Sequence, residues 1–273
     1  MITILVATDF SPIADNAVEY AAAIAKQVKA KLILFNAFVL PVHASNALIS
    51  ASAVQDLLDD DEARLKERAS LIASAYDINV VHEFRFSSVG DGLEALSNEY
   101  ELNAVVLGMA ARTLEQDLMG NTTTAAIKNL ELPVLAIPMG AKFDGMKKVL
   151  FACDVLKGVS ENVFTRIKRL SAELKSEIEV FYVDEKIKTL KAEGSAVLVT
   201  DVINDGLDGI TYSYKNVQSN SVIKEIKKEI IAFNAELLIM VPEEYGFWAS
   251  LVHRSKTRMM AAGLGIPLLS IPL

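Results

Sequence analysis

One sequence pattern occurs twice in the 273 residues and constrains the fold more than any other feature. Each copy opens with an apolar run that ends on an acidic residue, Ile2–Asp9 in the first copy and Lys147–Asp154 in the second. Apolar residues at helical spacing follow, over Ala14–Val28 and from Ser160 to Lys175, and each of these stretches leads to another apolar run. A pattern repeated at long spacing indicates a tandem architecture. We therefore expect two units that each begin as strand, helix, strand.

The ends of the two copies also correspond. Each finishes on an apolar run bounded by prolines, Leu132–Pro138 in the first and Ile266–Pro272 in the second. The short glycine-containing stretch between the copies, Met139–Gly145, predicts domains at residues 1–140 and 146–273. Consecutive strand–helix units with right-handed crossovers predict an α/β fold. We expect two tandem doubly wound, mostly parallel five-stranded sheets, with ligands bound outside the carboxyl ends of the strands.

Some segments of the second copy have weaker signals. We expect a strand over Gly209–Val217 and a helix over Ser219–Phe233, capped by Ser219 or Asn220. The region Lys186–Asp208 is expected to be helical, although its apolar run Ala196–Val199 is equally compatible with a strand. Cys153 is expected inside a core strand, as a small apolar residue.

Composition excludes several classes of function. Hydrophobic residues make up 52% of the chain, which favours a globular protein, and the net charge of −8 opposes attraction to nucleic acid or an anionic membrane. The one cysteine excludes an intrachain disulfide and fits a reducing compartment, so we expect a cytoplasmic protein. The three histidines are scattered along the chain and predict neither a metal site nor a catalytic triad.

The segment Gly108–Thr124 of the first copy is suited to anion binding, because it joins the end of an apolar run to a predicted helix. Glycine lets the backbone approach a phosphate closely, and Asn121 or Thr122 can cap the helix, whose free N–H groups then face the ligand. Arg112 can add a charge-assisted hydrogen bond.

This segment, with Thr8-Asp9-Phe10-Ser11 after the first strand and the closing Pro133–Pro138, resembles the universal stress protein family, in tandem over essentially the whole chain. Members that bind ATP carry Gly, two residues, Gly, nine residues, and then Gly-Ser or Gly-Thr. Here the two outer glycines are present, Ala111 replaces the middle one, the loop is one residue shorter, and Asn121 replaces the Ser or Thr.

The resemblance implies an adenine nucleotide alpha hydrolase-like fold, a role in the stress response, and binding of ATP or a related adenine nucleotide, with Mg²⁺ accompanying it. Asp9 would lie near the adenosine, the Ala37 backbone would face the adenine, and residues 120–122 would hold the phosphates. The implied nucleotide-binding residues are Thr8, Asp9, Ala37, Gly108, Met109, Arg112, Gly120, Asn121, Thr122 and Thr123. The resemblance also implies an intrachain pseudo-dimer through the last strands, and it leaves a homodimer open.

The matching segment of the second copy, Val241–Thr257, lacks both outer glycines, and two glutamates there would repel a triphosphate. We expect no nucleotide in this copy. Known catalytic motifs are absent from the sequence, so we expect at most weak ATP hydrolysis. The alternative is a scaffold or regulatory module that binds no nucleotide and acts through protein partners.

Overall fold

The computed structural model describes residues 1–40, 50–109, 121–153, 159–184, 202–242 and 265–273. The elements of the first half are β1 (Thr3–Ala7), α1 (Pro12–Val28), β2 (Lys31–Phe38), α3 (Ala51–Tyr76), β3 (Val80–Phe86), α4 (Val89–Glu99), β4 (Ala104–Met109), α5 (Asn121–Asn129) and β5 (Val134–Pro138). The elements of the second half are β6 (Lys148–Ala152), α6 (Glu161–Leu174), β7 (Glu177–Asp184), β8 (Tyr212–Gln218), α9 (Val222–Phe233), β9 (Leu237–Met240) and β10 (Leu268–Ser270).

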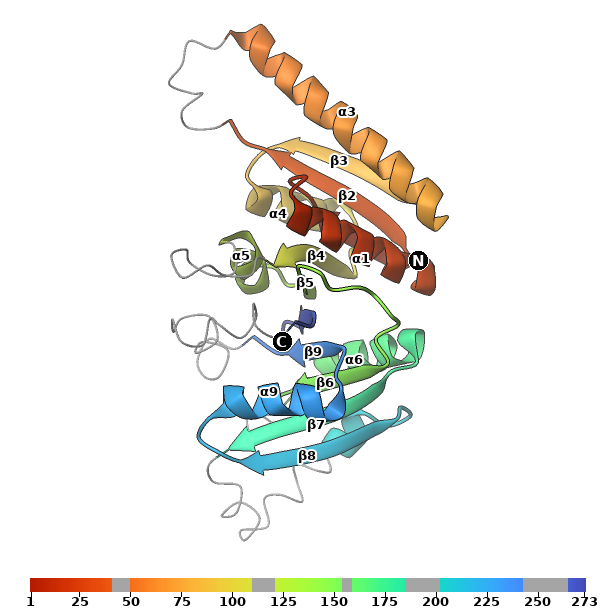
Figure 1. Ribbon diagram of the computed structural model, residues 1–273, viewed down its shortest axis with the longest axis vertical. Coiled ribbons are helices and arrows are strands. Elements are labelled where there is room, and N and C mark those ends of the chain that lie inside the picture. The colour runs from red at the N-terminus through yellow and green to blue at the C-terminus, as the bar shows by residue number, and fades with distance from the viewer. Residues whose placement is uncertain (41–49, 110–120, 154–158, 185–201, 243–264) are drawn as a thin grey trace.

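All of these strands join one ten-stranded sheet in the order β3-β2-β1-β4-β5-β10-β9-β6-β7-β8. The sheet follows the long axis of the molecule, with β3 near one end and β8 near the other (Figure 1). The strands within each half are parallel, and β5 and β10 join the halves as an antiparallel pair in which Leu269 lies opposite Leu135. The predicted mostly parallel α/β fold is confirmed, and its two five-stranded sheets are continuous.

Helices cover both faces of the sheet, because successive side chains of a buried strand point to opposite faces. In β1, Ile4 and Val6 belong to the core beneath α1, α3 and α6, whereas Leu5 belongs to the core beneath α4, α5 and α9. The equivalent helices α1 and α6 therefore lie on the same face of the sheet, although the strands of one half run antiparallel to those of the other. The halves are consequently related by a rotation about an axis perpendicular to the sheet.

Serine hydroxyls fix the starts of four helices by accepting the backbone N–H three residues later. These N-cap serines precede α1, α3, α4 and α6 and are Ser11, Ser50, Ser88 and Ser160. The expected cap of α9 was wrong, because Ser221 is its N-cap residue and makes no side-chain capping hydrogen bond.

Two other boundaries differ from the prediction. Cys153 follows β6 and is half-buried, so it does not lie inside the core strand. Strand β8 begins at Tyr212, because Gly209 has φ +86° and forms part of the preceding turn. Residues 202–206 are helical, as expected, and residues 186–201 lie outside the described part of the chain.

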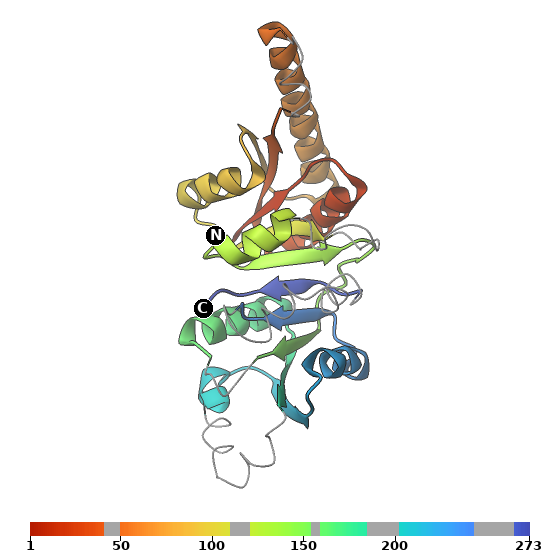
Figure 2. The same ribbon diagram turned by 90° about the vertical axis from the view of Figure 1, so that its left-hand side faces the viewer.

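The connection between the halves packs against α1. Phe143 meets the ring of Tyr20 edge-on at 5.5 Å, and the Asn16 side-chain amide donates to the Pro138 carbonyl at 3.2 Å. Both chain termini lie near the middle of the long axis, and α3 extends along one outer end (Figure 2). Among the described residues, no helix is both long and apolar enough to cross a membrane.

Candidate functional site

A cavity of about 220 Å³ lies at the carboxyl ends of β1, β2 and β4. The chain passes from β1 to β2 and β3 on one side and places β4 and β5 on the other, so this cavity lies at the topological switch point. Ligands of open α/β sheets bind at this point. The predicted site residues that line the cavity are Thr8, Asp9, Ala37, Gly108, Thr122 and Thr123.

The turn after β1 is held by its own polar groups. The Thr8 hydroxyl accepts the Phe10 backbone N–H at 3.0 Å, and the buried Asn36 amide donates to the Thr8 carbonyl at 2.7 Å. Asp9 accepts the Ser11 N–H through Oδ1 at 3.0 Å, and no described residue donates to its Oδ2. Asp9 therefore supports the start of α1 while its exposed carboxylate keeps one oxygen for a ligand.

Three helices begin at this cavity. Ser11 and Ile13 at the start of α1, Val89 at the start of α4, and Thr122 and Thr123 at the start of α5 all line it. The first N–H groups of a helix lack partners within it, and the helix dipole places positive charge at this end. The arrangement therefore favours an anionic group such as phosphate.

Gly108 has a packing role that the sequence did not reveal. A Cβ atom at this position would lie 2.7 Å from Ile13 Cγ2 and 2.9 Å from the Ile13 carbonyl oxygen. The absence of a side chain therefore lets the first turn of α1 lie directly against β4. Thr123 is buried, and its hydroxyl donates to the Gly108 carbonyl at 3.2 Å, which ties the start of α5 to the end of β4.

The remaining predicted residues lie elsewhere or outside the description. Met109 is 1% exposed and packs in the core rather than lining the cavity. Arg112 and Gly120 lie outside the described residues. Because α5 begins at Asn121, the expected capping role of Thr122 was wrong. The side chain of Asn121 is also outside the description.

Sequence reasoning missed the apolar wall of the cavity. Ile13, Phe35 and Val89 line it, and they come from α1, β2 and α4. A Cβ at Gly92 would lie 2.4 Å from the Phe35 ring, so this glycine makes room for the aromatic side chain. The sequence carried no signal for this wall, because a single glycine at position 92 does not indicate which distant side chain it makes room for.

The cavity is smaller than the roughly 300 to 1,000 Å³ of typical small-molecule sites. Residues 41–49 and 110–120, which follow β2 and β4 in the sequence, lie outside the described residues. The described portion combines an apolar wall, the Asp9 carboxylate and three helix N-termini, which suits a ligand that has both an apolar part and an anionic group. Among the described side chains, no group of three or more His, Cys, Asp or Glu is placed to hold a metal ion.

In the second half, Val241 and Pro242 follow β9, and the rest of the corresponding segment lies outside the described residues. The absence of nucleotide binding there stays a prediction.

Comparison with known proteins gives both a family and a fold. The model of the universal stress protein family matches residues 1–138. A universal stress protein from Archaeoglobus fulgidus DSM 4304 has a similar structure, with a TM-score of 0.72 at 15% identity over 99% of this chain and 98% of that one. A functionally unknown protein from Pseudomonas aeruginosa PAO1 gives a TM-score of 0.56 at 11% identity, over 99% and 92% of the two chains. No curated protein sequence matches the chain.

Proposed function

The chain belongs to the universal stress protein family, and from this premise we propose that its first half binds ATP or a related adenine nucleotide. The observation that carries the proposal is the cavity at the switch point, where β1, β2 and β4 end and α1, α4 and α5 begin. Its apolar wall suits a base, and its helix N-termini suit phosphates.

Each group has a role in this proposal. Asp9 Oδ2 accepts a hydrogen bond from a ribose hydroxyl, and the backbone at Ala37 faces the adenine. The phosphates lie at the start of α5, where Thr122 offers its hydroxyl. Arg112 and Gly120 belong to the segment that precedes α5 in the sequence. None of the described residues lining the cavity is cationic, so the helix N-termini, Arg112 and a Mg²⁺ ion would balance the phosphate charge.

We propose binding rather than turnover. In this proposal Oδ1 of Asp9 accepts the Ser11 N–H and Oδ2 accepts the ribose hydroxyl, and no described histidine lines the cavity to serve as a general base. ATP hydrolysis would therefore be slow at most.

Calorimetric titration of the purified protein with ATP and ADP tests the proposal. We expect saturable binding with a dissociation constant below about 1 mM. Thr122→Asp should weaken ATP binding about tenfold or more, because the new carboxylate would face the phosphates. An acidic residue in the first turn of a helix favours the helix, so α5 should still form.

Thr124→Asp is the matched control, because it adds the same charge to the same turn but Thr124 does not line the cavity. Its effect should stay within about threefold. Absence of saturable binding by the unaltered protein up to millimolar nucleotide would overturn the proposal. A scaffold that acts through protein partners would then be favoured, since packing alone already accounts for Gly108 and Thr123.

We also propose that residues 1–140 and 146–273 are two domains that form an internal pseudo-dimer. The antiparallel pair of β5 and β10 supports this arrangement, because it joins the last strand of each half. A complete internal pair predicts a molar mass of one chain, 29.7 kDa, in light scattering after size-exclusion chromatography. A mass of two chains would show a homodimer instead.

A further inference from the structure

A second cavity, of about 410 Å³, lies between α1 and α6 above the strand pair that joins the halves. Ile2, Ile24 and Val28 line it, which places it at the amino end of β1. It therefore lies at the opposite edge of the sheet from the first cavity, which is at the carboxyl ends of β1, β2 and β4. Among the described residues, the two cavities share no lining residue. The second cavity is therefore a separate place for a ligand.

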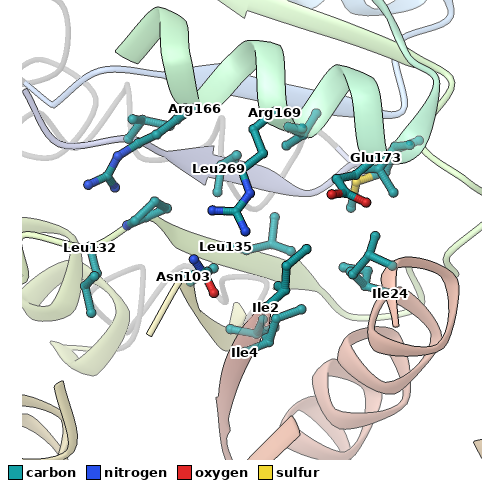
Figure 3. Close-up of a pocket in the computed structure, with 18 of the residues that line it drawn as sticks. Ile2, Ile4, Ile24, Asn103, Leu132, Leu135, Arg166, Arg169, Glu173 and Leu269 are labelled. Atoms are coloured by element: carbon teal, nitrogen blue, oxygen red, sulfur yellow. The ribbon is translucent and has the colours of Figure 1, made fainter. Parts of the chain in front are cut away.

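The floor and one side of this cavity are apolar. Ile4, Leu135 and Leu269 are buried and come from β1, β5 and β10, so both halves contribute to the floor (Figure 3). Its volume lies within the roughly 300 to 1,000 Å³ that small-molecule sites usually have. Burial of this surface against an apolar ligand lowers the free energy of the complex.

Two arginines of α6 stand at the opposite side. The side chains of Arg166 and Arg169 extend from the helix over the cavity, as Figure 3 shows. The Arg166 Nε donates to Asn162 Oδ1 at 3.3 Å. Within the parts of the chain that the structure describes, neither guanidinium forms an ion pair. Burial lowers the pKa of Arg166, so this side chain carries its charge at a partly desolvated position.

Two further polar groups limit the ligands that fit. Asn103 lines the cavity and accepts the Thr3 N–H through Oδ1 at 2.8 Å, which leaves its NH₂ group as a donor. Glu173 stands at the rim one turn beyond Arg169. Two guanidiniums and one carboxylate leave a net positive charge here, in a chain whose net charge is −8.

We propose that this cavity binds a medium-chain carboxylic acid. The alkyl chain lies on the apolar floor formed by both halves, and the carboxylate binds Arg166 and Arg169. The guanidinium group suits this role because its planar N–H groups match a carboxylate. A ligand here contacts both halves and therefore stabilises their junction.

Calorimetric titration with sodium decanoate tests the proposal, with decyltrimethylammonium as the probe that has the same chain length and the opposite charge. We expect one saturable site for decanoate and at least about tenfold weaker binding of the cation. The double variant Arg166→Gln/Arg169→Gln should lose about tenfold or more in decanoate affinity. Equal affinity for both probes, or an unchanged affinity of the double variant, would overturn the proposal.

Lys168→Gln is the control for the loss of a positive charge from α6, because each arginine substitution also removes one charge but Lys168 does not line the cavity. Its decanoate affinity should stay within about twofold. Ala104→Leu then tests the apolar part, since Ala104 lines the cavity from β4 and a larger side chain would fill it. Loss of decanoate binding with a retained circular dichroism spectrum supports the proposal, and unchanged binding contradicts it.

Sedimentation velocity distinguishes the other occupant, a second copy of this chain. If the unaltered protein self-associates, the arginine double variant does not, and decanoate binds neither, then the cavity is an interface between copies and the proposal is wrong.

Discussion

Gly108 lies at the end of β4, where the first turn of α1 approaches closely. A Cβ at position 108 would contact the carbonyl oxygen of Ile13. Because this atom belongs to the backbone, it cannot move aside as the end of a flexible side chain can. In this position the glycine serves the packing of a helix on the sheet, whether or not a phosphate binds nearby.

Gly108→Ala should therefore lower the free energy of unfolding by about 1 to 3 kcal/mol, as overpacking of a core does. Urea-induced unfolding measures the change. Gly90→Ala is the matched control, because a Cβ there would meet nothing closer than the Ser88 hydroxyl at 3.9 Å. Gly90 lies in α4, so this control should be neutral or stabilising by up to about 1 kcal/mol. Equal effects of the two substitutions would contradict the packing role of Gly108.

Glu179 is a buried carboxylic acid whose surroundings raise its pKa. It lies on β7, is 8% exposed, and faces the buried Glu229 of α9, whose carboxylate pairs with the Lys215 ammonium at 2.5 Å. Burial, and then the nearby charge of Glu229, raise the pKa of Glu179 from 4.5 to about 7. The folded protein therefore holds a proton on Glu179 at pH values where the unfolded chain has lost it.

Stability should consequently fall as the pH rises from about 4.5 to about 7, because the native state binds more protons in this window. The protonated Glu179 carboxyl contributes on the order of 1 to 3 kcal/mol of stability, which is fully present below about pH 4.5 and is lost as the pH rises through about 7. Glu179→Gln should flatten the slope, which urea unfolding across this pH range measures. Glu131→Gln, at an exposed carboxylate, should leave the slope unchanged. A slope that survives Glu179→Gln would exclude this carboxyl as its source.

At the scale of elements, the two halves of α3 differ in burial. It spans 26 residues, but its buried residues are Leu65, Ala69 and Ile72, all in the C-terminal half. That half is also tied to α1, because Arg68 and the Tyr76 hydroxyl both donate to the Glu19 carboxylate, at 2.8 and 2.7 Å. The N-terminal half lies along the outer end of the molecule (Figure 1).

Amide hydrogen exchange should therefore be faster in residues 51–64 than in residues 65–76, by about tenfold or more, because few buried contacts oppose local opening of the first half. Mass spectrometry of peptic peptides measures this difference. Helix α6 is the comparison within the same chain, since its buried residues run from Val163 to Leu174 and its protection should be even. Even protection along α3 would contradict the division.

At the scale of the whole molecule, the halves meet through the short ladder of β5 and β10. Leu135 and Leu269 lie directly opposite each other there, and both are buried at the floor of the second cavity. Cross-strand pairs of this kind are the unit of sheet stabilisation. The junction of the halves therefore depends on a few apolar contacts.

Leu135→Ala and Leu269→Ala should each cost about 2 to 4 kcal/mol, and their effects should couple by about 0.5 kcal/mol or more. Urea unfolding of the two single variants and the double variant measures the coupling. Leu65→Ala with Leu269→Ala is the control cycle. Leu65 is a buried residue of α3, which packs against β2 and β3, and β2 and β10 lie about 19 Å apart across the sheet, so those effects should add. Additivity of the two seam substitutions would show that the halves do not depend on this contact.

Local patterns in the sequence determined the elements of this protein. Strand β2 lies in the apolar run that follows the first predicted helix, because a strand buried on both faces forms a nearly continuous hydrophobic segment. The position of Thr8 and Asp9 in the cavity also followed, since residues just after a parallel strand must lie at the carboxyl edge of the sheet. A single capping hydroxyl such as Ser219 gave a weaker signal, because several neighbouring polar residues can start the same helix.

Tertiary structure alone decided which distant residues meet. Nothing in the sequence indicates that Phe35 and Val89 form one wall of a cavity. The spacing of Arg166 and Arg169 is equally typical of the exposed side of an ordinary helix, although both line the second cavity. The sequence determined the two-fold repeat of strands and helices, because hydrophobic periodicity and turn residues act over a few neighbouring positions. Only the folded chain decided the close approach at Gly108 and the cavity between the halves, because the distances there depend on how side chains from separate elements fill space.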